Sequence, residues 1–292
     1  EVFDLTLTLF CIERLLYRLS RSPYREQFVL KGAALFVIWG GAPHRATRDV
    51  DLLGRHPAGL DSVERAFREL CLLPVEPDGL VFPSESLGAR RIHEGQEHEG
   101  VRVTLTARLG QARIPLQVDV GFGSAVVPSP VEEVYPTLLP FPAPRLLAYP
   151  REVSVSEKFH AMVVLGMASS RLKDYYDVWV MASRFAFDGS VLRRSLGATF
   201  ERRNTPLPRE VPLALTEAFA HDREKRTQWE AFLRRGQLEA GTISLETAVA
   251  AVREFVMPPT LAAAEDGPFE MEWRDGGPWT GREQSTAHPS SP

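Results

Sequence analysis

Apolar residues recur every three to four positions in several parts of the chain, the spacing that places them on one face of an α-helix. Residues 3–20 have this pattern and stop at Ser22-Pro23, which predicts an amphipathic helix. Residues 60–72 predict a second helix. Beyond residue 189 the pattern predicts mostly helix, with segments at 191–201, 210–220, 225–235 and 244–255.

Strands are predicted where apolar and polar residues alternate, at 79–82, 101–106 and 114–121, with a loop or hairpin tip at 93–100. A short apolar run at 28–30 predicts a strand that ends in a tight turn at Gly32. A short buried helix over 33–39 follows, and Gly40-Gly41 ends it. Seven prolines between residues 128 and 150 predict an extended connector, which we take as the boundary between two lobes.

Two aspartates stand one residue apart in the expected strand Arg48–Leu53. Side chains alternate along a strand, so Asp49 and Asp51 point to the same face. Neighbouring carboxylates repel each other unless a cation lies between them. Mg²⁺ is commonly held by one or two carboxylates together with substrate phosphates. The pattern predicts a site for Mg²⁺, with Mn²⁺ as an alternative ion, although short acidic pairs also occur at solvated strand ends.

A third aspartate, Asp119, lies within an otherwise apolar expected strand. An unpaired carboxylate in such surroundings is strongly disfavoured, so the residue needs a partner or a function. Alternation puts Gln117 and Asp119 on one face of that strand. Two interpretations stay open: a functional acid, or a strand-edge aspartate that caps Gly121–Gly123.

The order of glycine turn, short helix and D-x-D strand resembles the nucleotidyltransferase superfamily that includes DNA polymerase beta. The finer pattern, G-A-A-L at 32–35 and H-R-x-T-x-D-V-D-L at 44–52, is similar to the AbiEii/AbiGii nucleotidyltransferase toxins, which include the MenT group of mycobacteria. The resemblance implies that Asp49 and Asp51 hold metal and that Asp119 supplies a third carboxylate, which helps to deprotonate the acceptor. It also implies nucleotide contacts from Lys31, Gly32, Ala33, Arg45, Thr47 and Lys158.

The chain departs from the superfamily pattern at Ala33, where a serine is usual. The substitution removes one hydroxyl contact to phosphate, but backbone N–H groups at a helix N-terminus can bind phosphate without it. This departure keeps open the alternative that the chain is a catalytically impaired relative acting as a binding module.

A second signature of these toxins lies in two later helices. Ser154-x-x-Glu157 is a capping-box pattern, which predicts a helix start with Lys158 just beyond the cap. A cation at the positive end of a helix is mildly unfavourable, which favours a functional role for Lys158. A compact ammonium also suits triphosphate oxygens.

The helix that follows carries R-x-K-D-x-x-D at 171–177. Together with Glu157-Lys158 this motif resembles the toxins, and the resemblance implies functional roles for Lys158, Asp174 and Asp177. Asp174 and Asp177 are about one turn apart and share a helix face, and Lys173 is expected to pair with Asp177 at the i,i+4 spacing.

Composition narrows the class of protein. The chain has 292 residues, of which 44% are hydrophobic and 25% charged, ordinary globular values that leave room for two lobes. Cys11 and Cys71 both lie in apolar helical contexts, which argues against a disulfide framework or zinc site and favours a cytoplasmic location. No apolar run approaches membrane-spanning length, so no membrane association is expected.

The net charge of −4 excludes a basic field over the whole molecule, so a nucleic-acid surface must be local. The densest basic grouping falls in the helical half. Together with Arg45 and Arg48 it could follow RNA phosphates, but it alternates with glutamates and suits a solvated helix surface equally well. The residues are Arg193, Arg194, Arg202, Arg203, Arg209, Arg223, Lys225, Arg226, Arg234 and Arg235.

We therefore predict an α+β protein. A polymerase-beta-like nucleotidyltransferase lobe with a mixed sheet spans residues 1–145, a helical lobe that completes the active site spans 146–257, and 258–292 form a flexible tail. The predicted reaction transfers a nucleoside monophosphate from a nucleoside triphosphate to an acceptor hydroxyl, with Lys158 stabilising charge on the phosphates. The resemblance implies the 3′ end of tRNA as acceptor and a growth-blocking toxin neutralised by an antitoxin. A metal-dependent D-x-D glycosyltransferase is a further alternative.

Overall fold

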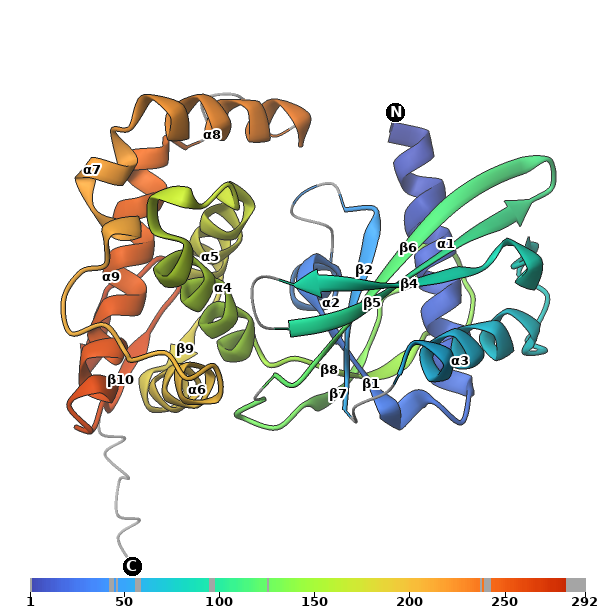
Figure 1. Ribbon diagram of the computed structural model, residues 1–292, viewed down its shortest axis with the longest axis horizontal. Helices are drawn as coiled ribbons and strands as arrows, with labels where there is room; N and C mark the ends of the chain where they lie inside the picture. Colours follow the sequence, from blue (N-terminus) through green and yellow to red (C-terminus); the bar gives the residue numbers. More distant parts are fainter. Residues whose placement is uncertain are drawn as a thin grey trace, which may run out of the picture. The chain divides into compact units, whose positions relative to one another are not determined.

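The computed structural model describes residues 2–41, 45, 47–55, 59–94, 98–124, 126–236, 238 and 243–281. The chain divides into two compact units, Glu1–Pro150 with Gly236–Leu238, and Arg151–Arg235 with Glu239–Pro292. The first unit contains the large sheet and the second contains most of the helices (Figure 1). The division falls at Pro150 and not at residue 145, because residues 145–148 form a strand of the sheet.

A mixed sheet, which has eight strands within the described residues, organises the first unit. Its order is β3-β5-β6-β2-β1-β8-β7, with β4 paired to β5. The central strand β2 is parallel to β6 and antiparallel to β1, as expected of the predicted mixed sheet. The strands are β1 Phe28–Lys31, β2 Asp49–Gly54, β3 Leu80–Val81, β4 Gly88–Glu94, β5 His98–Leu109, β6 Ala112–Phe122, β7 Val131–Val134 and β8 Arg145–Ala148.

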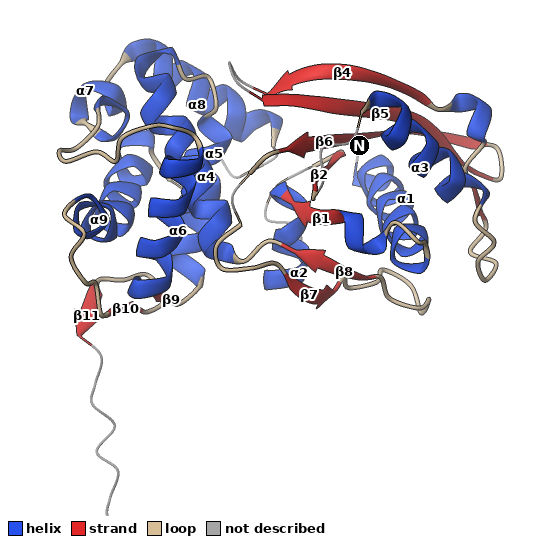
Figure 2. Ribbon diagram, turned by 60° about the horizontal axis from the view of Figure 1, so that its bottom comes forward, coloured by secondary structure: helices blue, strands red, loops and turns tan. Residues whose placement is uncertain are grey.

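Two helices cover one face of this sheet, α1 (Val2–Arg21) and α3 (Leu60–Leu72), and both match their predicted positions. They lie side by side in Figure 2. The ring of Phe67 on α3 meets that of Phe28 on β1, with centroids 5.8 Å apart. The apolar side chains that the strands send to this face form the core of the unit. The opposite face carries buried Val29 and Leu53 together with polar side chains.

The proline-rich segment is part of the sheet and not a connector between lobes. It contains β7 and β8, and β8 pairs in parallel with β1. The prolines did predict extended backbone correctly. Strand β8 was missed because its partner β1 is remote in sequence, and pairing of this kind leaves no local periodic signal. Strand β7 pairs with the nearby β8, but each has only four residues, too few for a clear alternation.

The second unit is mainly helical. Its helices are α4 Arg151–Leu165, α5 Leu172–Arg184, α6 Gly189–Arg202, α7 Glu217–Ala220, α8 Arg223–Arg235 and α9 Leu245–Ala264. The predicted helix at 210–220 forms only over its last four residues, because Leu213–Leu215 form a short 3-10 turn and Thr216 is extended. None of the helices in the described residues is long and apolar enough to cross a membrane.

The expected flexible tail is wrong as far as residue 281. Helix α9 continues through Pro258-Pro259, and β10 (Met271–Trp273) and β11 (Trp279–Gly281) then form a small sheet with β9 (Phe187–Asp188). Trp273 is 3% exposed and its indole N–H donates to the Ala182 carbonyl at 2.7 Å. Two tryptophans thus anchor a segment whose glycines and prolines predicted disorder; residues 282–292 lie outside the described part.

Candidate active site

Four charged residues form one row across four neighbouring strands, here called the carboxylate row. Lys31 of β1 lies opposite Asp51 of β2, Asp51 lies beside Asp119 of β6, and Asp119 lies opposite Arg102 of β5. Residues in register send their side chains to the same face of a sheet, and Asp49, two positions from Asp51, shares that face. Asp49, Asp51 and Asp119 therefore lie on adjacent strands and face one side, as their alternation predicted.

The turn before α2 (Leu35–Gly40) fits closely against this row. Gly32 has φ +75°, in the left-handed region that favours glycine. A Cβ atom at this position would lie 2.7 Å from Cγ and 2.8 Å from Cβ of Asp51. Ala33 follows, buried in the turn, and the short helix ends at Gly40 as predicted. Glycine at 32 thus lets the Asp51 carboxylate lie directly against the turn.

Asp119 is held by a bidentate ion pair. The Arg102 guanidinium donates from Nε to Oδ1 and from Nη2 to Oδ2, both at 2.7 Å, and Gln117 Nε2 donates to Oδ2 at 3.3 Å. The Asp119 side chain is 11% exposed and that of Arg102 is 29% exposed. The expected need of Asp119 for a partner is met by Arg102, which sequence analysis did not single out because the pairing of β5 with β6 was not known.

The other candidates of the first unit are Lys31, Thr47 and Arg45. Lys31 is half-buried at the end of β1. Thr47 donates its hydroxyl to the Asp49 carbonyl at 3.4 Å, so it contacts the backbone of the aspartate strand. Arg45 is half-buried in the preceding connection, and His44 of the quoted motif lies outside the described residues.

A second charged group, the lysine cluster, lies between α4 and α5 of the second unit. Lys158 Nζ donates to Asp174 Oδ1 at 3.0 Å and to Asp177 Oδ2 at 2.7 Å. Arg171 Nε donates to the other Asp174 oxygen at 2.7 Å. The side chains of Asp174 and Asp177 are 1% and 0% exposed, against 12% for Lys158. The three residues that the toxin motif singled out are thus in direct contact.

Two local predictions for this cluster are wrong. Helix α4 begins at Arg151, so Ser154 lies inside it and forms no cap, and Lys158 is in the middle of the helix, where the predicted end effect does not act. Lys173 is exposed and does not pair with Asp177, whose carboxylate bonds to Lys158 instead. The ammonium of Lys158 compensates the charge of the two buried carboxylates to which it donates.

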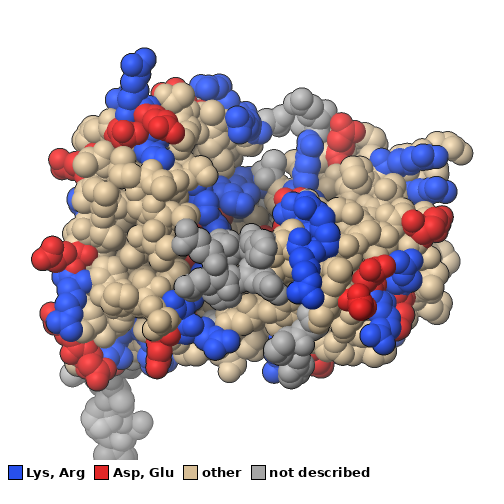
Figure 3. All heavy atoms as spheres, in the orientation of Figure 1, with Lys and Arg blue, Asp and Glu red and all other residues tan. Residues whose placement is uncertain are grey.

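Four of the ten basic side chains in the predicted grouping have acidic partners. Lys225 is buried and donates to the Ser169 carbonyl at 2.8 Å. Acidic and basic side chains also lie next to each other on the face presented in Figure 3. This pairing favours the interpretation of a structural or solvated surface. The pairs are Arg193–Asp266 at 2.9 Å, Arg203–Glu157 at 3.7 Å, Arg226–Glu246 at 3.5 Å and Arg234–Glu230 at 3.7 Å.

The donor set suits a hard divalent cation that is shared with a substrate. In the part of the chain that the structure describes, no three His, Cys, Asp or Glu side chains are grouped to hold a metal by themselves. Asp49 and Asp51 instead offer two carboxylates on one face, while Asp119 is engaged by Arg102. Two carboxylates completed by phosphate oxygens and water are an ordinary Mg²⁺ environment, so these residues fit the ion.

Comparison with known proteins identifies relatives of the chain. The family model described as "Nucleotidyl transferase AbiEii toxin, Type IV TA system" matches residues 14–251. No curated protein matches in sequence. Two solved structures from Helicobacter pylori are loosely similar at 10% identity: JHP933, with TM-score 0.45 over 87% of this chain and 88% of that one, and a chain proposed to be a nucleotidyltransferase, with TM-score 0.41 over 87% and 91%.

Proposed function

The chain belongs to the AbiEii family of nucleotidyl transferase toxins from type IV toxin–antitoxin systems, and we propose that it transfers a nucleoside monophosphate from a nucleoside triphosphate to the 3′ hydroxyl of an RNA, with tRNA as the expected acceptor. Family membership implies a nucleotide substrate and an antitoxin partner. Modification of a tRNA end would block translation and growth, and such an acceptor implies action in the cytoplasm.

The observation that carries the proposal is the carboxylate row beside the Gly32 turn. Asp51 lies against the turn and in register with Asp119. A triphosphate seated at this turn would present its phosphates to Asp49 and Asp51 on one side of the row. An acceptor hydroxyl that approaches Asp119 would then be next to the α-phosphate, so the sheet brings both reactants together.

In the reaction, the acceptor oxygen forms a new bond to the α-phosphorus, the bond from that phosphorus to the β-phosphate bridge breaks, and pyrophosphate leaves. Asp119 Oδ1 accepts from Arg102 Nε, and a carboxylate oxygen has a second lone pair. We assign this free acceptor position to the hydrogen of the attacking hydroxyl. Arg102 then acts as a positioning residue, because its fork fixes the plane of the carboxylate.

Asp49 and Asp51 would hold Mg²⁺, which supplies positive charge for the phosphate oxygens and lowers the cost of bringing a triphosphate to two carboxylates. Lys31, opposite Asp51, adds a cation to the same face. A phosphate-binding role for Lys158 is proposed on the family motif alone; within its own unit its ammonium donates to Asp174 and Asp177.

A direct experiment incubates the protein with each radiolabelled nucleoside triphosphate, Mg²⁺ and total cellular RNA. The proposal predicts label in an RNA of tRNA size with one or more of the four nucleotides, and none when Mg²⁺ is chelated. Binding of nucleotide and RNA without transfer would instead support the binding-module alternative that Ala33 keeps open. Label in no RNA, with a folded protein, would overturn the proposal.

A further inference from the structure

The strands β4, β5 and β6 present an open face that continues the carboxylate row. Along β5 the buried Val101, Val103 and Leu105 alternate with residues that point away from α1 and α3. Most outward residues of these strands are polar or basic, with Pro115 and Ile92 as apolar exceptions. We call the following polar and basic set the arginine face: Arg90, Thr104, Thr106, Arg108, Arg113 and Gln117.

Strand register connects the arginine face to the site. Arg90 lies opposite Arg102, which holds Asp119. Arg108 and Arg113 lie opposite each other near the β5–β6 turn. Residues 102 and 108 are six positions apart on one strand, and at about 3.3 Å per residue the face extends roughly 20 Å from the carboxylate row. A molecule bound along this face would have one end at Asp119.

The charges on this face are not balanced within the protein. Among the described residues, none forms an ion pair or hydrogen bond with the side chains of Arg90, Arg108 or Arg113, whereas Arg193 and Arg203 of the helical half have acidic partners. Arg108 and Arg113 are exposed and directly opposed across the hairpin. Like charges in this position destabilise a sheet, so the pair is costly unless an anion binds to it.

The shape and composition of the face indicate which kind of anion it binds. The face is narrow, since it spans three strands that lie about 4.8 Å from their neighbours and is therefore about 10 Å wide, which suits one nucleic-acid strand better than a duplex. In the described residues of β4, β5 and β6 no aromatic side chain lies on this face, so stacked bases have no platform. Arginines alternating with threonine hydroxyls and an amide suit phosphate and sugar oxygens, contacts that carry no sequence information.

We propose that the arginine face binds the sugar–phosphate backbone of the single-stranded 3′ segment of the acceptor RNA and leads its terminal hydroxyl to Asp119. The inference rests on the proposed function, because it identifies how the acceptor of that reaction is held. It assigns acceptor binding to the sheet and not to the arginines of the helical half.

The test measures binding without turnover. A fluorescent single-stranded RNA of mixed sequence with a free 3′ hydroxyl is titrated with wild-type protein and with Arg108→Gln/Arg113→Gln, at 50 and 200 mM salt. A single-strand contact contributes about 0.7 to the slope of log affinity against log salt, so losing two contacts lowers the slope by about 1.4. Between the two salt concentrations, wild-type affinity should then fall about sevenfold more than variant affinity.

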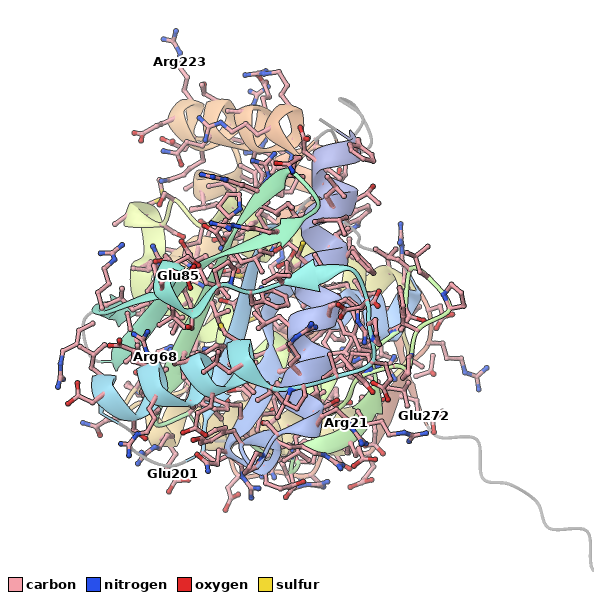
Figure 4. All side chains as sticks on the ribbon, turned by 90° about the vertical axis from the view of Figure 1, so that its right-hand side faces the viewer. Arg21, Arg68, Glu85, Glu201, Arg223 and Glu272 are labelled. Carbon is pink, nitrogen blue, oxygen red and sulfur yellow. The ribbon has the colours of Figure 1, made fainter. Side chains whose placement is uncertain are left out.

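Two further variants make the result specific. Arg21→Gln/Arg65→Gln removes the same charge from exposed positions on α1 and α3, the helices of the opposite face, and should bind RNA as the wild type does (Figure 4 labels Arg21). Arg108→Lys/Arg113→Lys keeps both charges and should retain most of the affinity and salt slope. Circular dichroism and thermal unfolding of each variant separate loss of binding from loss of fold.

The outcomes separate this inference from the proposed function. Weakened binding by the glutamine variant alone supports the arginine face, even if the wild type transfers no nucleotide. If Arg108→Gln/Arg113→Gln binds RNA with the affinity and salt slope of the wild type, the inference is overturned, even if the wild type labels RNA. An acidic protein would then be the alternative ligand of the face. Equal weakening by both glutamine variants also overturns it, because general charge and not this face would then control binding.

Discussion

The Asp51 carboxylate lies where the side chain of any residue other than glycine at position 32 would be. An ideal Cβ on Gly32 would come within 2.7 Å of Asp51 Cγ, closer than real Cβ contacts. The turn that follows β1 and the aspartate strand β2 are therefore fitted to each other. The Asp51 carboxylate can occupy its position only because residue 32 has no side chain.

Gly32→Ala should abolish detectable transfer and lower the free energy of unfolding by at least about 1–2 kcal/mol. The left-handed backbone alone costs an alanine that much, and the added methyl must also displace Asp51. Gly41→Ala is the matched control: Gly41 has φ +74°, but an added Cβ would meet nothing within 4 Å. It should lose similar stability from backbone strain and keep its activity. Equal loss of transfer in both variants would show that the contact with Asp51 is unimportant.

Lys158 has a structural role as well as the proposed one. Lys158→Met leaves Asp174 and Asp177 buried without their cation, which should cost about 3 kcal/mol or more in unfolding free energy. Lys158→Met/Asp174→Asn/Asp177→Asn removes the buried charges with it and should recover part of that loss. Chemical denaturation measures the recovery, and the transfer assay should stay at background in both variants. Recovery of transfer together with stability would mean that Lys158 only holds α4 to α5.

The C-terminal segment should contribute to stability. Trp273→Ala removes a ring that is 3% exposed and packs on Phe255 with centroids 4.9 Å apart, and should cost about 3–5 kcal/mol. Thr280→Ala, at an exposed position on β11, should change the free energy of unfolding by less than about 0.5 kcal/mol. Urea denaturation compares the two variants. Similar small losses would mean that β10 and β11 are not docked in solution.

Cys11 gives a prediction for alkaline pH. Burial, and then the nearby Asp78 charge, raise the pKa of its thiol from 9.0 to about 12. The folded protein thus holds this proton more tightly than the unfolded chain does. The stabilisation is complete below the unfolded pKa and is lost as pH rises from there towards 12, by about 1.4 kcal/mol per pH unit. Between pH 7 and pH 10, the free energy of unfolding should fall further for the wild type than for Cys11→Ala. An equal fall in both proteins would contradict the raised pKa.

Sequence patterns predicted the features of the fold that depend only on residues close together in the chain. The helix at 60–72 was predicted to the residue because Val63, Phe67 and Leu70 form an uninterrupted stripe. The shared face of Asp49 and Asp51 needs only strand alternation. The Asp119–Arg102 pair could not be predicted, because it depends on which strand lies beside β6. Strand β8 was missed for the same reason, because it pairs with the remote β1.

Other errors came from patterns that tertiary packing overrides. Ser154 and Glu157 have the spacing of a capping box, but Pro150 precedes the helix and α4 starts at Arg151. The segment after Pro258 has the composition of a flexible tail, yet Trp273 and Trp279 bury enough ring surface to order it. A few large side chains can outweigh the composition of the segment that carries them.

The most direct test of the central claim compares wild type with Asp51→Asn in the transfer of labelled nucleotide to RNA with Mg²⁺ present. Asparagine keeps the shape that fits against Gly32 and removes the charge that would hold the metal. We predict that transfer falls at least about a hundredfold, while the free energy of unfolding changes by less than about 1 kcal/mol because a repelling carboxylate has been removed. Transfer by Asp51→Asn at the wild-type rate would contradict the assignment of this row as the active site.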